Sequence, residues 1–235
     1  MRASILLPCL PLAGCLVHQE LYDERADALG RGSWGVGFET DSDCLVVDAR
    51  DLDLGDTFTF DAYLQGDAAP GPGLFPVVSW PGAFAVYQDT DGYLVMGSTD
   101  TSDASAGTST SISLLDGARH HLAAGYGQNG YASLFLDGTR VAFASLDLAP
   151  TPGDTLYLGC WPEEEVAFRG VIGEVRLSAA AFYGTDFTPE WTPYPVSDAT
   201  LALWHLEEGD GVEVRDEVGV APGRLSGGVW VPFPL

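Results

Sequence analysis

From Trp34 onward the sequence is built of short runs of alternating apolar and polar residues, which Gly, Pro, Asp and Asn interrupt. The run 56–65 (DTFTFDAYLQ) is the clearest example, because every second residue is apolar: Phe58, Phe60, Ala62 and Leu64. A period of two predicts a half-buried β-strand. Many such runs without a long amphipathic helix predict a β-sandwich.

Turn signals divide the chain into hairpins. Asn129-Gly130 lies between the runs 119–127 and 131–136, and Asn-Gly is the dipeptide that favours a tight hairpin turn most strongly. Asp89-Thr90-Asp91 lies in the same way between 82–88 and 92–98. About a dozen strands are therefore expected. The Pro- and Thr-rich segment 187–197 has no period and is predicted to be a linker or strap.

The charge of the chain excludes one class of partner. Its 34 acidic residues exceed its 10 basic ones, which gives a net charge of −24, and every basic residue is an arginine. A polyanion of this kind repels phosphate backbones, so nucleic-acid binding is excluded.

The N-terminus has the pattern of an export signal. Residues 1–15 (MRASILLPCLPLAGC) join one arginine, a short apolar stretch and small residues before Cys15. This segment resembles the bacterial lipoprotein signal, in which the cysteine after the cleavage site is lipidated. The resemblance implies a signal peptide at 1–14, lipid on Cys15 and a tether at 15–33. The alternative is an ordinary secretory signal with an incidental cysteine.

Export would allow the remaining cysteines to form a disulfide. Cys9 would be removed with the signal, which leaves Cys44 and Cys160 in an exported domain where a disulfide is permitted. The pair is predicted either as a disulfide or as two small buried side chains. No Cys-x-x-Cys or Cys/His spacing indicates zinc.

Three segments carry a resemblance to a known family: SWGVGFETDSDCLVVDARDLDLGDTFTFDAYLQ, then GARHHLAAGYG with YASLFLDGTRVA, then LYLGC with FRGVIGEVRLS. Their order and spacing over about 34–185 resemble the laminin-G-like branch of the concanavalin A-like lectin/glucanase sandwiches. The resemblance implies an all-β, concanavalin A-like antiparallel β-sandwich of jelly-roll type.

The final segment is out of its usual place. Residues 201–232 (LALWHLEEGDGVEVRDEVGVAPGRLSGGVWVP) resemble what normally begins such a domain. We expect residues 199–235 to complete the sandwich of 34–235 from its C-terminal side. The alternative is a truncated second copy, which would leave Trp204 and Trp230 exposed.

The chain departs from the family pattern at two informative places. Gly173, followed by Glu174, stands where the pattern has aspartate and glutamate, and in related sandwiches that aspartate helps to hold a structural calcium. Arg119 stands where the pattern has tryptophan before a histidine pair. His120 and His121 are interpreted as structural residues on a strand.

Several acidic motifs are candidates for catalytic or metal-binding sites. Residues 208–213 (EGDGVE) match the E-x-D-x-x-E signature of related glucanases, but their glycines suit a turn better than a strand. Calcium is conceivable and not favoured, because the candidate clusters are typical of solvated turns: Asp41/Asp43, Asp89/Asp91 and Glu163/Glu164/Glu165. We expect neither a metal nor a cofactor.

Exposed aromatic rings are the remaining candidates for ligand contact, since flat rings stack on sugars and anchor interfaces. Trp80 and Trp161 lie beside loop signals and are the predicted ligand-binding residues. The sequence thus predicts a non-enzymatic exported lipoprotein that is held at the envelope, on the outer membrane, and binds carbohydrate or a surface protein. A glycan-cleaving enzyme and a structural envelope protein without a small ligand are the alternatives.

Overall fold

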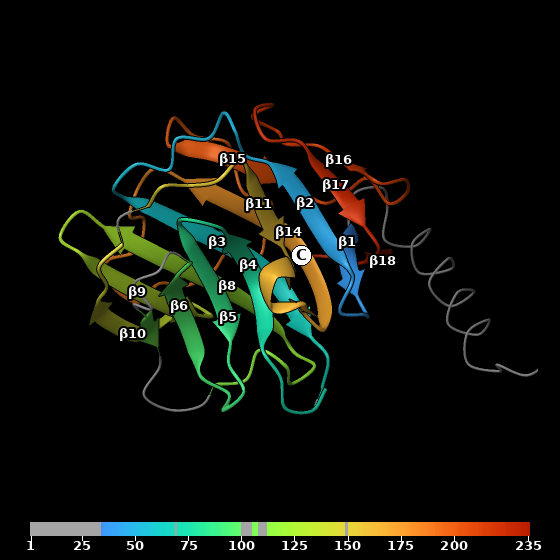
Figure 1. The fold of residues 1–235 in the computed structure, drawn as a ribbon, viewed down its shortest axis with the longest axis horizontal. Helices are drawn as coiled ribbons and strands as arrows, with labels where there is room; N and C mark the ends of the chain where they lie inside the picture. The colour runs from blue at the N-terminus through green and yellow to red at the C-terminus, as the bar shows by residue number, and fades with distance from the viewer. Residues whose placement is uncertain (1–33, 69, 100–104, 108–111, 149) are drawn as a thin grey trace, which may run out of the picture.

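The computed structural model describes residues 34–235 apart from 69, 100–104, 108–111 and 149. The predicted signal peptide at 1–14, the lipidated Cys15 and the tether at 15–33 lie outside the described residues. Two large antiparallel sheets lie one over the other (Figure 1), which confirms the predicted all-β sandwich. Among the residues described, no helix has the length and apolar character needed to cross a membrane.

Sheet A has eight strands. In spatial order they are β10 (Thr139–Ser145), β9 (Tyr131–Leu136), β8 (Arg119–Gly127), β3 (Phe58–Gly66), β14 (Gly170–Ser178), β1 (Trp34–Phe38) and β18 (Val229–Pro232), with β15 (Thr200–Trp204) also paired to β14. The predicted Asn129-Gly130 turn joins β8 to β9.

Sheet B also has eight strands. In spatial order they are β16 (Glu213–Val214), β17 (Gly223–Ser226), β2 (Cys44–Asp48), β11 (Thr155–Leu158), β4 (Phe75–Trp80), β5 (Phe84–Gln88), β6 (Leu94–Ser98) and β7 (Ser105–Gly107). A small ribbon of β12 (Cys160–Trp161) and β13 (Val166–Ala167) encloses the 3₁₀ turn η1 (Pro162–Glu164).

The core lies between the sheets and is rich in aromatic rings. The ring of Phe58 from sheet A lies 4.7 Å from that of Phe84 in sheet B, and Trp80 meets Phe84 edge-on at 6.5 Å. Trp80 is fully buried, and its Nε1–H donates to the Gly153 carbonyl oxygen at 2.8 Å. The prediction that Trp80 binds ligand is therefore wrong, because its side chain points into the core.

Strand β3 is buried on both faces, so the expected half-buried strand is also incorrect. The second face is covered by residues 182–195, called the strap below, which crosses the outer side of sheet A. Thr59 on this face donates to the Ala180 carbonyl oxygen at 2.5 Å and accepts from the Phe182 N–H at 3.1 Å. The Pro-rich segment thus forms a second, smaller layer over the sheet.

The C-terminal segment adds strands to both sheets of the same sandwich. One edge of β14 is shared: its first residues pair with β1, and Val175–Ser178 pair with β15. Strand β17 pairs with β2, and β18 pairs with β1. Trp204 on β15 is fully buried, and its Nε1–H donates to the Ala221 carbonyl oxygen at 2.8 Å.

Cys44 on β2 and Cys160 on β12 form a disulfide, with their Cα atoms 5.2 Å apart. The bond links the small ribbon to sheet B. Gly159, directly before Cys160, has φ +71°, and a Cβ there would lie 2.4 Å from the Phe38 ring. Glycine is required at this position because any other side chain would clash with the Phe38 ring and would strain the left-handed backbone.

Candidate functional site

A pocket of about 240 Å³ lies between the strap and the outer face of sheet A. Tyr63 (β3), His121 (β8) and Arg176 (β14) form its sheet side, where Tyr63 is directly opposite His121 in the pairing of β3 with β8. The strap contributes the other wall: Tyr183, Phe187, Thr188, Pro189, Glu190, Thr192, Pro193, Tyr194 and Pro195. We call this the strap pocket.

Four tyrosine or phenylalanine rings line the pocket, those of Tyr63, Tyr183, Phe187 and Tyr194. The ring of Tyr63 stacks on that of Tyr194 at 5.0 Å, and Trp191 lies 5.1 Å from Tyr63 on another side. Tyr183 stacks on Phe187 at 3.9 Å. Trp191 has φ +52°, a left-handed conformation that is unusual for a bulky residue and is found mainly where the surroundings hold it in place.

An ion pair lies at the base of the pocket. Arg176 donates from Nε and Nη2 to Oδ2 of Asp61, at 3.2 and 3.0 Å, and Asp61 is completely buried. The rings of Tyr194 and Phe182 lie 4.3 and 4.9 Å from the Arg176 Cζ atom. Burial raises the pKa of Asp61, and the neighbouring Arg176 charge opposes that shift.

Two polar atoms of residues that line the pocket have no hydrogen-bond partner among the described residues, and Oδ1 of Asp61 at its base has none either. The two are Nδ1 of His121, whose residue is 1% exposed, and the hydroxyl of Tyr194, whose residue is 8% exposed. Burial lowers the pKa of His121 to about 4, so its ring is neutral at pH 7. A buried polar group without a partner is costly, and such a group beside a cavity indicates a bound water or ligand.

Glu174 fixes the strap to the sheet. It is 2% exposed, and its Oε1 accepts from the Tyr194 N–H at 2.6 Å and lies 2.8 Å from Nδ1 of His205. The hydrogen bond to Glu174 raises the pKa of His205. Because the Tyr194 backbone is held in this way, its ring and hydroxyl have a fixed position in the pocket.

The two neighbouring histidines have different surroundings. His120 lies between two carboxylates, with Nδ1 2.8 Å from Asp137 and Nε2 3.1 Å from Asp116, and so ties a hairpin to the preceding loop. His121 points to the other face and lines the strap pocket. His121 thus belongs to a candidate site, which its interpretation as a purely structural residue did not include.

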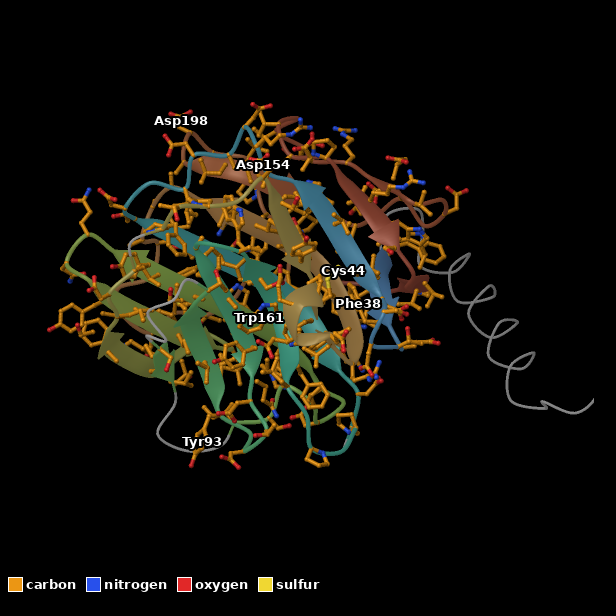
Figure 2. The ribbon with its side chains drawn as sticks, in the orientation of Figure 1. Phe38, Cys44, Tyr93, Asp154, Trp161 and Asp198 are labelled. Carbon is orange, nitrogen blue, oxygen red and sulfur yellow. A yellow bond between two sulfur atoms is a disulfide. The ribbon has the colours of Figure 1, made fainter. Side chains whose placement is uncertain are left out.

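Trp161 lies over the other sheet. Its half-buried ring is 5.6 Å from that of Tyr87 on β5, and η1 with Glu163 and Glu164 follows it directly. In Figure 2, Trp161 and Cys44 lie near the middle of the molecule, with Tyr93 and Asp154 toward opposite ends. Trp80, in contrast, is buried in the core, so the two tryptophans do not form one site.

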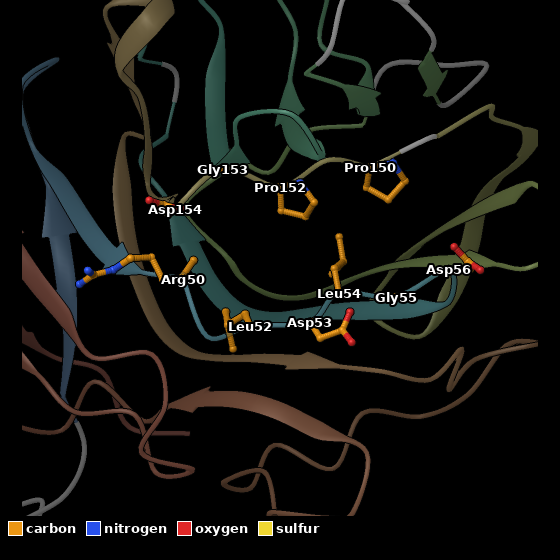
Figure 3. A pocket seen from close by; sticks show the side chains of 11 residues that line it. Arg50, Leu52, Asp53, Leu54, Gly55, Asp56, Pro150, Pro152, Gly153 and Asp154 are labelled. Carbon is orange, nitrogen blue, oxygen red and sulfur yellow. The ribbon is translucent and has the colours of Figure 1, made fainter.

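A second pocket of about 310 Å³ lies at the loop end of the sandwich (Figure 3). Pro150 and Pro152 face Leu54 across it, while Asp56 and Asp154 lie toward its two ends. None of the described residues that line it is aromatic, so they offer carboxylates and small apolar surfaces but no ring on which a sugar could stack.

Two of the acidic clusters considered for calcium, Asp41/Asp43 and Asp89/Asp91, belong to hydrogen-bonded turns. Asp43 accepts hydrogen bonds from the Glu39 and Thr40 N–H groups at 2.8 and 2.9 Å, and these bonds lower its pKa against the opposing effect of burial. Asp89 accepts from the Asp91 and Tyr93 N–H groups at 3.0 and 2.8 Å. Over the described ranges, no group of three or more His, Cys, Asp or Glu side chains is placed to hold a metal ion.

Comparison with known families agrees with this architecture. A laminin G model described as "Concanavalin A-like lectin/glucanases superfamily" matches residues 38–186, well over half of the chain. This chain belongs to the concanavalin A-like lectin/glucanase superfamily. No curated protein sequence matches it.

Two solved structures resemble this one in fold. A protein from Bacteroides ovatus ATCC 8483, provisionally assigned as a carbohydrate binding protein, superposes with a TM-score of 0.66 at 16% identity over 88% of this chain. The chain spans 61% of that protein's length. The heptameric SAP-like pentraxin of Limulus polyphemus superposes with a TM-score of 0.55 at 12% identity, covering 83% of this chain and 96% of that one. These likenesses establish the fold.

The glucanase signature of the superfamily is not formed here. Glu208, Gly209, Asp210 and Gly211 lie in a loop, where both glycines have positive φ, and only Glu213 of the motif belongs to a strand. Glu208 accepts the Arg215 N–H at 2.8 Å. The carboxylates therefore do not line up on one strand face as that chemistry requires.

Sequence reasoning missed the strap aromatics of this superfamily member. Trp191 and Tyr194 lie in a segment without periodicity, which was predicted only as a linker or strap. One signal was present: three aromatic residues and four prolines or threonines crowd into FTPEWTPY (187–194), an unusual density for a linker. Their packing against β3 could not be read from this density.

Proposed function

We propose that this protein is a non-enzymatic carbohydrate-binding module that holds a sugar in the strap pocket. The observation that carries the proposal is the combination of stacked aromatic walls with two unpartnered polar atoms, on His121 and Tyr194. Sugars have apolar C–H faces that pack on aromatic rings and hydroxyls that both donate and accept hydrogen bonds. The strap pocket offers partners for both.

The size of the pocket supports a small ligand. Binding pockets commonly measure about 300–1,000 Å³, and this one measures about 240 Å³. A single sugar ring therefore suits it better than a large molecule. The resemblance in fold to a protein provisionally assigned as a carbohydrate binding protein supports the same class of ligand.

The test is calorimetric titration of the full chain with the sugars that a glycan array selects. Tyr194→Phe removes only the hydroxyl and should weaken binding about three- to tenfold, the cost of one lost hydrogen bond. Trp191→Ala removes the ring that packs on Tyr63, a residue that lines the pocket, and should weaken binding about tenfold through the loss of this support. Unchanged affinity in both variants contradicts the location of the site.

The matched control is Trp161→Ala, which removes an indole from the opposite sheet. Trp161 and Tyr87 form an aromatic pair on the outer side of sheet B and make this face the second candidate for ligand contact, with sugar or protein. Binding that survives in Tyr194→Phe and Trp191→Ala but is lost in Trp161→Ala transfers the function to sheet B.

A glycan-cleaving enzyme is the alternative from another class. It requires two carboxyl groups about 5–10 Å apart on either side of the scissile bond. Asp61 is engaged with Arg176, and Glu174 is engaged with Tyr194 and His205, so neither has the exposure of a catalytic acid. Turnover of a β-glucan that Glu208→Gln abolishes would support the enzyme.

We also propose that the module is exported and anchored to the cell envelope through lipid on Cys15, with the outer membrane as its destination. Leu16 follows Cys15, and no aspartate occupies that position, which is compatible with outer-membrane sorting. Two or more acyl chains would hold it there stably, whereas one chain alone binds only marginally. A surface glycan or a protein carrying it would then be the partner, and silence across the glycan array would favour a structural envelope protein without a small ligand.

A further inference from the structure

We propose that the strap pocket selects uncharged sugars and rejects acidic ones such as uronates, an inference that rests on the carbohydrate-binding function proposed above. The positive charge at the pocket is paired with Asp61, and the remaining charge, on Glu190, is negative.

The base of the pocket is an ion pair whose charges cancel. Among the residues that the structure describes, Arg176 is the only cation that lines the pocket, and its Nε and Nη2 both donate to Oδ2 of Asp61. Two aromatic rings lie within 5 Å of its Cζ atom, those of Tyr194 and Phe182. A carboxylate on a ligand would have to compete with Asp61 for this guanidinium, so Arg176 offers little net attraction to an anion.

The histidine beside the ion pair adds no positive charge. His121 is 1% exposed, and its Nε2 lies 3.8 Å from Asp61 Oδ1, too far for a hydrogen bond. A buried imidazole near the Arg176 guanidinium favours the neutral form, which can donate to or accept from a hydroxyl but cannot pair with a carboxylate.

The remaining charge at the pocket is negative. Glu190 lines it from the strap and is exposed, and the whole chain has a net charge of −24. Like charges within about 10 Å repel one another at ordinary ionic strength. A sugar with a carboxylate or sulfate would meet this repulsion without a compensating cation, whereas a neutral sugar would not.

The test compares sugars that differ only at carbon 6. The full chain is titrated with methyl glucoside and methyl glucuronide, and with methyl galactoside and methyl galacturonide, at low ionic strength. The neutral member of a pair is expected to bind at least about tenfold more tightly, as for one uncompensated like charge near the site. Equal or tighter binding of the acidic member overturns the inference while leaving carbohydrate binding intact.

Glu190→Gln provides the second measurement, because it removes the rim charge and keeps the shape of the side chain. The ratio between neutral and acidic sugars should fall in this variant, and added salt should reduce the ratio in the unmodified protein as well. A ratio that neither change affects shows that charge is not the basis of selection. Binding of no sugar in either pair, together with a silent glycan array, overturns the proposed function itself.

Discussion

The ring of Phe233 occupies the space directly above Gly173: a Cβ at Gly173 would lie 2.3 Å from its Cδ1 atom. Arg119 lies 5.1 Å from the centroid of the same ring and donates a hydrogen bond to the Pro234 carbonyl oxygen. Gly173 and Arg119 are the two positions at which the chain departs from the family pattern. Both departures therefore accommodate the C-terminal residues that follow β18.

A methyl group at position 173 should disturb this contact. Gly173→Ala is expected to lower the free energy of unfolding by about 2 kcal/mol, because the new atom forces the Phe233 ring out of its place. Phe233→Ala alone should cost about 3 kcal/mol through lost packing of a buried ring. Urea denaturation of both single variants and the double variant checks the coupling.

In the double variant the clash is absent, so its loss of stability should be smaller than the sum of the two single losses. Simple additivity would show that Phe233 does not pack on Gly173 in solution.

Reduction of the Cys44–Cys160 disulfide should destabilise the protein strongly. The bond closes a loop with a sequence separation of 116 residues, and constraining a loop of this length in the unfolded chain is worth about 5 kcal/mol. The urea midpoint measured with and without a reducing agent tests this. The Cys44→Ala/Cys160→Ala variant serves as control, since its midpoint should not respond to the reductant.

Stability should decline as the pH falls from about 6.5 to 4 because of His121. Its pKa is about 4 in the folded protein and 6.5 in the unfolded chain, so the unfolded chain binds the proton first. The contribution is present above pH 6.5 and is lost as the pH falls toward the folded pKa. A shift of this size amounts to about 3 kcal/mol.

Many carboxylates also titrate in this range, so a comparison isolates the histidine. His121→Gln cannot gain a proton, and the difference in unfolding free energy between the unmodified protein and this variant should shrink by about 3 kcal/mol between pH 7 and pH 4. Parallel stability profiles for the two proteins would contradict the buried, neutral state of His121.

The proposed anchor on Cys15 is open to direct labelling. Cells that express the full chain and are fed a palmitate analogue should incorporate label into the protein, and Cys15→Ala should abolish it. Unlabelled wild-type protein, or label that persists in the variant, would reject lipidation at this residue.

The strands could be predicted because their signals are local. The alternation in 56–65 corresponds to β3, and Asn129-Gly130 forms the turn between β8 and β9, since side-chain period and turn geometry depend only on neighbouring residues. The same alternation misjudged burial. The pattern places Thr59 and Asp61 on an exposed face, but both are buried. The segment that covers them is distant in sequence, as the hydrogen bond from Thr59 to the Ala180 carbonyl oxygen shows.

The candidate site could not be predicted from the sequence, because its residues are brought together only by the tertiary fold. Tyr63, His121, Arg176 and Tyr194 come from three strands and the strap, and no spacing in the sequence relates them. Trp80 was predicted to be exposed because the loop signal Pro81-Gly82 follows it. It is instead the last residue of β4, and its ring points into the core. Proximity to a turn does not determine which way a side chain points.

The pairing of β1 with β18 sets a condition on how the protein can fold. Trp34 lies opposite Pro232, so the first and last strands described are hydrogen-bonded neighbours. Sheet A cannot attain its full width until β18 (Val229–Pro232) has been synthesised, and contacts between such distant segments form slowly. An exported chain of the kind proposed above would therefore complete its sandwich only after its last described strand has been synthesised.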